Sequence, residues 1–309
     1  MASGAAVAAL KIRAAEWQLD LIERPGRIGA ILWGCELWMI HQDDALRVEL
    51  SGPEARLVGN MREAVADMLA EVGLAVTWDR LDVGALAPGL ALMRLVHVTR
   101  RSPNFLRIRL TGPEAARFGR GSLHFRLLLP PRDRAPVWPR VGETGRSIWP
   151  EGADALHRPV YTVAAQGGDW LDFDVFVHPG SPTCDWATTT LPGQEVGVIG
   201  PGGGWCPEAA HLRLFGDQAA LPAIARILDL TGGEARAVIR CAPRDLGPLA
   251  EDPRVDLAED LLGALADCDI PRNCHVWFAA RADEARHARQ HLVARGLTKR
   301  EFTTAAYWD

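Results

Sequence analysis

The stretch "HLRLFGDQAALPAIARILDL" (211–230) joins a predicted strand to a predicted helix through a turn that contains a glycine. Further strands are predicted in "ARAVIRCA" (235–242) and "CHVWFAA" (274–280), and further helices follow each of them. Strands that alternate with helices are typical of a parallel sheet with crossover connections. Such sheets bind nucleotides where a strand ends and a helix begins, so we expect a nucleotide-binding α/β domain over 206–309.

The residues before this domain show a different pattern. Strand follows strand with glycine and proline between them, and one helix signal occurs at "PTCDWATTTL" (182–191). The segment 131–156 is rich in proline, glycine and charge and is predicted to be a loop. This pattern predicts an antiparallel β-barrel domain over 89–205.

The pattern of the first part of the chain predicts a third, small α+β domain over 10–88. A linker is predicted at 83–90. The stretch 26–52 alternates apolar and polar residues as strands do, and 52–73 has apolar residues at helical spacing. The Ala-rich start is predicted to be a disordered tail or an expression remnant. The predicted fold class is therefore multi-domain, α+β and α/β.

Bulk composition excludes several classes of protein. The chain has 309 residues and a net charge of −5, which argues against a general nucleic-acid binder. Its six cysteines show no CxxC pair and no zinc spacing, so we expect reduced thiols and no metal site. No run of about 20 apolar residues free of charge occurs, so no membrane association is expected and a cytoplasmic location is predicted.

The strand "RPVYTVAA" (158–165) carries side chains that suit a planar heterocycle with a phosphate tail. Tyr161 offers an aromatic face, Thr162 a hydroxyl and a backbone N–H, and Arg158 a cation. An ordinary exposed strand with a tyrosine at its rim is the alternative interpretation.

Two further stretches suggest phosphate binding. "HPGSPTCDWATTTLPG" (178–193) begins a helix whose free N–H groups suit a pyrophosphate, with Thr183 as a possible cap. A plain capped helix explains it equally. "GPGGGW" (200–205) lacks a following helix, so a flexible hinge explains it better than a dinucleotide loop.

Together these motifs resemble a known family. "RPVYTV", "TCDWA", "LPGQEVGVIGPGG", "GDQAALPAIARIL", "HVWFAA" and "AAYWD" occur in the order found in siderophore-interacting proteins. These are FAD-dependent ferric-siderophore reductases of the ferredoxin-reductase-like group. The resemblance spans about 90–309. Residues 10–88 look like a small domain of unknown function that is sometimes joined to such reductases.

The resemblance implies cofactor roles for individual residues, and none of them is a catalytic acid or base. Arg158 would contact the FAD phosphates, Tyr161 would pack on the isoalloxazine, and Thr162 would lie near its N5 edge. The remaining residues implied to bind FAD or the nicotinamide nucleotide are Val163, His178, Thr183, Cys184, Trp186, Ala187, Gly216, Asp217, Ala220, Pro222, Tyr307 and Trp308.

The chain departs from the family pattern in several places. One extra residue separates Arg158 from Tyr161, and Asp185 stands where a basic residue is common. Ala279-Ala280-Arg281 replaces an A-G-E motif, which puts nucleotide binding in more doubt than flavin binding. Arg240 and Arg244 would favour NADPH over NADH, or are simply solvated arginines.

The implied activity is the reduction of a ferric siderophore by NADPH or NADH through FAD. A general flavin reductase with another donor or acceptor and a non-enzymatic flavin- or siderophore-binding protein are the alternatives. The siderophore and the oligomeric state stay open. Cations expected to meet an anionic chelate are Arg100, Arg101, Arg117, Arg120, Arg295, Lys299 and Arg300.

Overall fold

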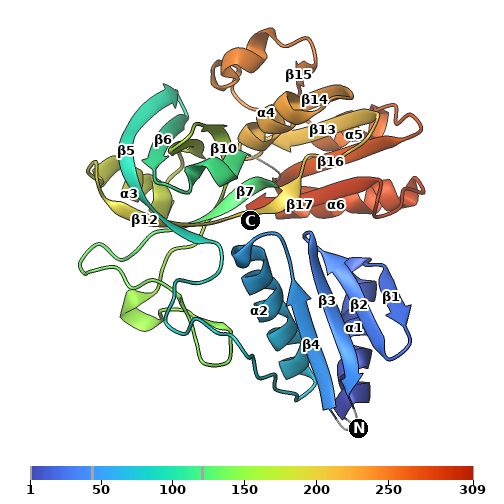
Figure 1. Ribbon diagram of the computed structural model, residues 1–309. Helices are drawn as coiled ribbons and strands as arrows, with labels where there is room; N and C mark the ends of the chain where they lie inside the picture. The colour runs from blue at the N-terminus through green and yellow to red at the C-terminus, as the bar shows by residue number, and fades with distance from the viewer. Residues whose placement is uncertain (1, 43–44, 120–121, 309) are drawn as a thin grey trace. The chain divides into compact units, whose positions relative to one another are not determined.

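The computed structural model describes residues 2–42, 45–119 and 122–308 (Figure 1). The chain divides into two compact units. Unit 1 comprises Met1–Leu90 and Pro130–Leu156, and unit 2 comprises Ala91–Leu129 and His157–Asp309. The segment 131–156, predicted as a loop, thus belongs to the same unit as the N-terminal residues. The boundaries proposed for three separate domains stay a prediction.

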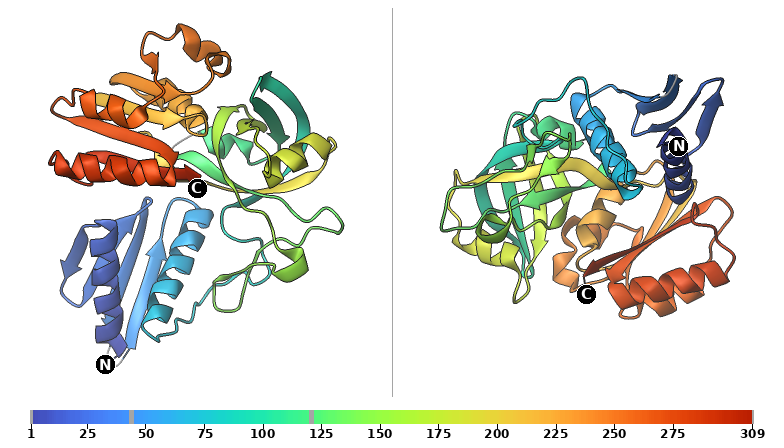
Figure 2. Two further views of the ribbon diagram at one scale, coloured as in Figure 1. Left: turned by 180° about the vertical axis from the view of Figure 1, so that it is seen from behind. Right: turned by 90° about the horizontal axis from the view of Figure 1, so that it is seen from below.

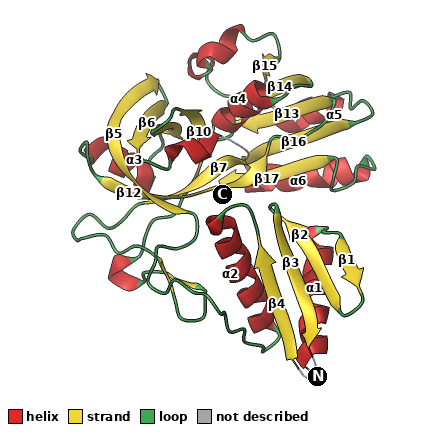
Figure 3. Cartoon of the chain, viewed as in Figure 1, coloured by secondary structure: helices red, strands yellow, loops and turns green. Residues whose placement is uncertain are grey.

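Unit 1 is a four-stranded antiparallel sheet with two helices. The strands, in the order β1-β2-β3-β4, are β1 (Leu21–Arg24), β2 (Arg27–Leu32), β3 (Cys35–Gln42) and β4 (Ala45–Ser51). The helices are α1 (Ala2–Trp17) and α2 (Ala55–Glu71), and both contribute to one core with the sheet (Figure 3). Short strands β8 (Arg140–Val141) and β9 (Ser147–Ile148) and the turn η2 (Gly152–Asp154) interrupt the later segment.

The prediction that the chain starts with a disordered tail was wrong. Helix α1 begins at Ala2, and its buried residues are Ala6, Ala9, Leu10 and Ala14. These residues recur at helical spacing, so one face of the helix packs on the sheet. The alanines that suggested low complexity are the small residues that allow this close packing.

Unit 2 begins with a closed six-stranded barrel in the order β10-β11-β6-β5-β12-β7, seen from two directions in Figure 2. The strands are β5 (Leu90–Ser102), β6 (Phe105–Thr111), β7 (Ser122–Leu128), β10 (Val160–Gln166), β11 (Trp170–Phe176) and β12 (Glu195–Trp205). The turn η1 (Ala115–Gly119) and helix α3 (Pro182–Thr189) accompany them. Buried Phe125 and Phe173 fill the barrel with their rings edge to face, so the predicted barrel is confirmed.

The rest of unit 2 is a parallel sheet in the order β15-β14-β13-β16-β17. Its strands are β13 (His211–Asp217), β14 (Glu234–Arg240), β15 (Val255–Leu257), β16 (Cys274–Arg281) and β17 (Phe302–Trp308). Its helices are α4 (Leu221–Leu230), α5 (Leu261–Asp267) and α6 (Ala282–Ala294), with turns η3 (Pro243–Asp245) and η4 (Gly247–Glu251). The predicted parallel sheet is confirmed, and β15 and β17 add two strands that the sequence pattern did not indicate.

Two buried contacts join the barrel to the parallel sheet within unit 2. The Asp245 carboxylate accepts hydrogen bonds from the Ser102 hydroxyl (2.6 Å) and from the Asn104 side-chain amide (2.8 Å). From α4, the Arg226 guanidinium donates to the carbonyl oxygens of Val163 (2.9 Å) and Phe118 (3.1 Å). Because Val163 follows Thr162 directly, the helix of the nucleotide domain holds the strand that is expected to bind flavin.

None of the helices in the described ranges combines the length and apolar character needed to cross a bilayer. The described part of the chain also contains no group of three His, Cys, Asp or Glu residues that could hold a metal ion.

Candidate functional site

The middle of β10 presents two adjacent residues to different surroundings. The Tyr161 ring lies 5.0 Å from the Phe173 ring and packs against the barrel core together with fully buried Val163. Burial raises the pKa of Tyr161 to about 12, so its phenol stays protonated. Thr162 is buried on the other side of the strand, where its hydroxyl meets His124. Tyr161 and Thr162 therefore face opposite sides of β10.

His124 connects β10 to the last strand of the chain. Its Nδ1 lies 3.0 Å from the Thr162 hydroxyl, and its Nε2 lies 3.0 Å from the Tyr307 hydroxyl. Burial, with a smaller contribution from the Arg226 charge, lowers the pKa of His124 to about 4. A neutral imidazole has one donor and one acceptor nitrogen, and hydroxyl groups can complement both. We call Thr162, His124 and Tyr307 the histidine junction.

Sequence reasoning missed His124. It lies in β7, and nothing in the local sequence pattern distinguishes it from any other polar strand residue. The two partners of its ring are 38 and 183 residues away, so only the tertiary fold brings them together.

Helix α3 starts beside Tyr161, but its cap differs from the predicted one. Ser181 is the N-cap, and its hydroxyl accepts a hydrogen bond from the Cys184 backbone N–H at 3.3 Å. Thr183 lies inside the first turn, where its buried hydroxyl is hydrogen-bonded to His157 (3.2 Å) and to the Tyr161 phenol. Pro182 occupies the first helical position, which proline favours. The residue before it, Ser181, is therefore the N-cap.

The other residues of this segment define what a phosphate would meet. The side chains of Cys184, Trp186 and Ala187 are buried in the barrel core. Pro182 has no N–H, and the N–H groups of Cys184 and Asp185 are hydrogen-bonded to Ser181, so of the first-turn donors α3 offers an anion the Thr183 N–H. Asp185 is exposed rather than turned into the barrel, so its carboxylate repels a phosphate at the start of α3 less than an inward-facing one would.

Arg158 and His178 are both exposed. Arg158 precedes β10, and its carbonyl oxygen accepts a hydrogen bond from Arg126 at 2.8 Å. The imidazole of His178 stacks on Phe176, with ring centroids 6.2 Å apart, just after β11. Because neighbouring His157 is hydrogen-bonded to Thr183, Arg158 is held near the start of α3.

The glycine run 200–204 is part of strand β12, so the prediction of a flexible hinge was wrong. Gly202 pairs with His124, and Trp205 pairs with Ser122 across two register shifts. A Cβ atom at Gly202 would meet nothing within 4 Å, whereas one at Gly204 would lie 3.3 Å from the His124 ring. Gly204 therefore lies in close contact with the His124 ring, whereas Gly202 faces open space.

At the predicted nucleotide turn, Asp217 is fully buried at the end of β13. One carboxylate oxygen accepts from the Ala219 backbone N–H (2.9 Å) and the other accepts from the Trp308 indole (2.6 Å). Burial raises the pKa of Asp217 although these bonds and Arg240 oppose the shift. Gly216 is required here, because a Cβ would lie 2.6 Å from Ala220, which precedes Leu221 and Pro222 at the start of α4.

The cations expected near a nucleotide 2′-phosphate are not equally available. Arg240 forms two 2.7 Å hydrogen bonds to the Glu284 carboxylate and lies 3.8 Å from Asp217. Arg244 is exposed. In the altered motif, Ala280 is fully buried, and Arg281 is paired with Asp283 at 2.5 Å.

The structure does not bring the predicted chelate-binding cations together. Arg101 is ion-paired with buried Asp174 (3.1 Å), whereas Arg100 is exposed and donates to Pro103 O. Lys299 and Arg300 are exposed before β17 begins, at the opposite end of that strand from Tyr307 and Trp308. Seven strand residues span about 20 Å, so neither of these two cations belongs with the junction. Arg117 is paired with Glu114, Arg295 donates to Cys268 O, and Arg120 lies outside the described residues.

These residues fit a flavin dinucleotide. Tyr161, Thr162 and the start of α3 lie on connected parts of the barrel, because the Tyr161 phenol is hydrogen-bonded to Thr183 in the first turn of α3. The buried carboxylate and glycine turn of β13 suit the nucleotide that would approach from the parallel sheet.

Comparisons with known proteins match both halves of unit 2. The siderophore-interacting FAD-binding domain model matches residues 94–205, and the siderophore-interacting protein model matches residues 209–309. The NADPH-dependent ferric-chelate reductase of Escherichia coli is 33% identical over 236 residues, which cover 70% of this chain and 91% of that protein.

Other relatives match over a shorter length. The ferric vibriobactin reductase of Vibrio cholerae is 33% identical over 150 residues, 45% of this chain, so the chain spans about half of that protein (53%). A siderophore utilization protein from T. fusca has a similar structure, with a TM-score of 0.57 and 27% identity over 74% of this chain and 95% of that one. A ferredoxin NADP+ reductase from Neisseria gonorrhoeae, at 13% identity and a TM-score of 0.52 over 71% of this chain and 99% of that one, shares the fold.

Proposed function

Because the chain belongs to the siderophore-interacting protein family, we propose that it is an FAD-dependent reductase that transfers electrons from NADPH or NADH to a ferric siderophore. The reaction is proposed to take place in the cytoplasm. The curated relatives carry names of the same kind, ferric-chelate and ferric-siderophore reductases.

The histidine junction is the observation that carries this proposal. Thr162 lies on the strand expected to bind the isoalloxazine, and Tyr307 lies on the last strand of the parallel sheet. His124 joins the two through one hydrogen bond to each. Next to Tyr307, Trp308 is bonded to Asp217 in the nucleotide turn. The elements expected to bind the electron donor and the flavin are thus joined by direct side-chain contacts.

The chain's own residues bind and position rather than transfer protons. Tyr161 and Thr162 would hold the flavin ring, and Arg158 with the start of α3 would hold its phosphates. Bound FAD supplies the ability to accept an electron pair and to release single electrons. Iron(II) is held less tightly than iron(III) by hard oxygen ligands, so reduction of the chelated metal favours its release.

A second candidate, a flavin-dependent reductase with another donor or acceptor, is favoured by one observation. Arg240 is neutralised by Glu284, and Arg281 stands where the family has an acid, so the nucleotide side of the site departs from the family more than the flavin side does.

Anaerobic spectroscopy separates these functions. The protein is reconstituted with FAD and mixed first with NADPH or NADH, then with a ferric siderophore and an iron(II)-trapping chelator. The proposed function predicts bleaching of the flavin by the nucleotide, recovery of its colour with the ferric chelate, and trapped iron(II). A bound flavin that neither nucleotide bleaches points to another donor, and failure to bind FAD contradicts the proposal.

A further inference from the structure

The sheet of unit 1 ends in a strand that lacks a neighbour on one side. In the described residues β4 pairs with β3 alone, and it is seven residues long with no glycine or proline (Figure 1). Exposed sheet edges of this length are templates for pairing with another strand, and proteins usually protect them. β1, the opposite edge, has only four residues, which is one such protection.

Space runs along this edge of β4. Every residue from Ala45 to Ser51 lines a cavity of about 1250 Å³, which is also lined by Val58, Arg62 and Leu69 of α2 and by the segment 74–80. Among the described residues no backbone hydrogen bond joins 74–80 to β4. The outer donors and acceptors of β4 are therefore not taken by this segment.

The sequence of β4, "ALRVELS" (45–51), is complementary to itself when it is run antiparallel about its centre. A two-fold axis at Val48 places Arg47 opposite Glu49 of a second copy, and Leu46 opposite Leu50 of that copy. The charged pair and the leucine pair each occur twice by symmetry, and Val48 meets its own counterpart. Cross-strand pairs of opposite charge and of apolar residues both stabilise antiparallel sheets.

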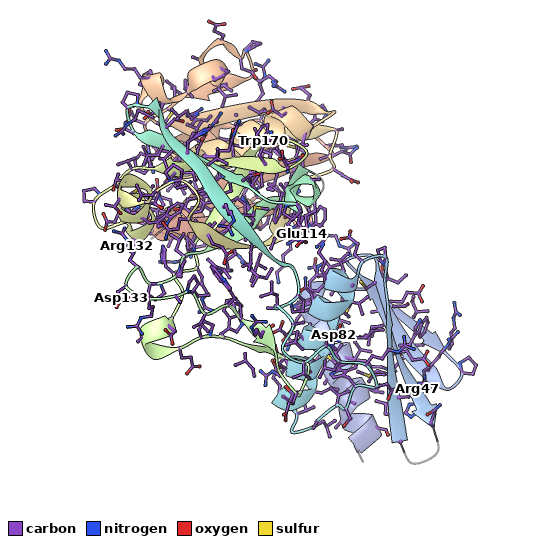
Figure 4. All side chains as sticks on the ribbon, turned by 60° about the vertical axis from the view of Figure 1, so that its left-hand side comes forward. Arg47, Asp82, Glu114, Arg132, Asp133 and Trp170 are labelled. Atoms are coloured by element: carbon purple, nitrogen blue, oxygen red, sulfur yellow. The ribbon has the colours of Figure 1, made fainter. Side chains whose placement is uncertain are left out.

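The two faces of β4 suit this arrangement. Arg47 and Glu49 project from the same face, where their side chains are 53% and 46% exposed and pair with each other at 3.1 Å; Figure 4 labels Arg47 on this sheet. Leu46, Val48 and Leu50 lie on the other face, partly buried against the core of unit 1. Self-pairing would therefore place opposite charges next to each other on one face of the sheet and apolar side chains next to each other on the other face.

The opposite edge lacks this property. Antiparallel self-pairing of β1, "LIER" (21–24), would place Ile22 opposite Glu23 and Leu21 opposite Arg24. These pairs set apolar side chains against charges, so self-complementarity distinguishes β4 from its counterpart at the other end of the sheet.

We propose that β4 is a homodimerisation strand, which pairs antiparallel with β4 of a second copy about Val48 and forms a continuous eight-stranded sheet. Closed two-fold interfaces require a self-complementary surface, and this strand supplies one. A seven-residue ladder is small compared with a standard interface of about 800 Å² per partner, so we expect an affinity in the micromolar range.

A charge exchange tests the pairing on the full chain. Sedimentation velocity over a range from about 1 to several hundred micromolar is expected to show a monomer–dimer equilibrium for the unchanged protein. Arg47→Glu and Glu49→Arg each set like charges across the axis and should weaken the dimer roughly tenfold or more. The double variant restores opposite charges and should recover dimerisation. Both sites are exposed, and circular dichroism checks that each variant folds.

Cysteine cross-linking tests the register. Directly opposed residues in an antiparallel pair have Cα atoms about 4.5–5.5 Å apart, within the range of a disulfide. Val48→Cys should therefore form an intermolecular disulfide. Leu46→Cys should not, because the two copies of position 46 lie about 13 Å apart along the strands. A chain that stays monomeric throughout, a dimer insensitive to charge reversal, or equal cross-linking at positions 46 and 48 each overturns the proposal.

Discussion

The hydroxyl of Tyr307 lies 3.0 Å from Nε2 of His124, although 183 residues separate them in the chain. Tyr307 belongs to the last strand of the parallel sheet, and His124 belongs to the barrel. Through its other nitrogen, His124 reaches the Thr162 hydroxyl. One neutral imidazole therefore fixes β10, the strand expected to bind flavin, relative to the C-terminal aromatic residues.

Replacing the imidazole should destabilise the fold. His124→Ala leaves two buried hydroxyl groups without a partner, and each unsatisfied group costs about 1–3 kcal/mol. We expect the free energy of unfolding to fall by at least about 2 kcal/mol in a urea titration. His97→Ala, at an exposed position of barrel strand β5, is the control and should change it little. Equal stability of both variants would show that the junction contributes nothing.

Acid should destabilise the protein through the same group. The pKa of His124 is about 4 in the folded state and about 6.5 in the unfolded chain, so only the unfolded chain takes up this proton between those values. Stability should therefore fall by up to about 3 kcal/mol as the pH decreases from 6.5 to 4.

The contribution of His124 is the difference in pH-dependent stability between the unchanged protein and a variant without this imidazole. Burial also lowers the pKa of His157 and of His275, so these residues add to the slope of the unchanged protein. Urea unfolding at several pH values should give a shallower slope for His124→Gln. Parallel slopes would mean that His124 titrates normally.

The Thr162 hydroxyl should affect electron transfer more than folding. Thr162→Val keeps the shape of the side chain but removes the hydroxyl next to the expected edge of the flavin. We expect FAD to remain bound and the rate of its reduction by NADPH to fall about tenfold, which corresponds to about 1.4 kcal/mol. Thr99→Val, on exposed β5, is the control for stopped-flow measurement. An unchanged rate in Thr162→Val would exclude a role for the hydroxyl.

Choice of nucleotide should depend on Glu284. Its carboxylate neutralises Arg240 through two hydrogen bonds, so Glu284→Gln should free the guanidinium for a 2′-phosphate. The ratio of kcat/KM for NADPH to that for NADH should rise severalfold. Asp283→Asn weakens the exposed pair with Arg281 but keeps an oxygen that can accept from the Glu284 backbone N–H, so it should leave the ratio unchanged. A ratio that responds equally to both substitutions would mean that Arg240 does not contact the nucleotide.

Patterns over short stretches predicted most of this architecture. Alternation in "RPVYTVAA" and "WLDFDVFVH" predicts β10 and β11, and the strand–turn–helix stretch at 211–230 predicts β13 and α4. These elements bury one face or one stripe, and burial leaves a regular trace in the sequence.

Contacts between distant elements left no such trace. His124 and Arg226 lie in elements whose local pattern does not set them apart, and their partners lie 38 to 183 residues away. Arg101 was expected to meet the substrate as a cation facing an anionic chelate, but it is ion-paired with buried Asp174. The short strand β15 has only three residues, too few for any periodicity.

A crystal structure of the chain grown with FAD tests the placement of the flavin most directly. The account predicts the isoalloxazine against Tyr161, with its edge within hydrogen-bond distance of Thr162, and the phosphates between Arg158 and the first turn of α3. Electron density for the ring at any other part of unit 2, with Tyr161 and Thr162 still closed in by their present neighbours, would contradict it.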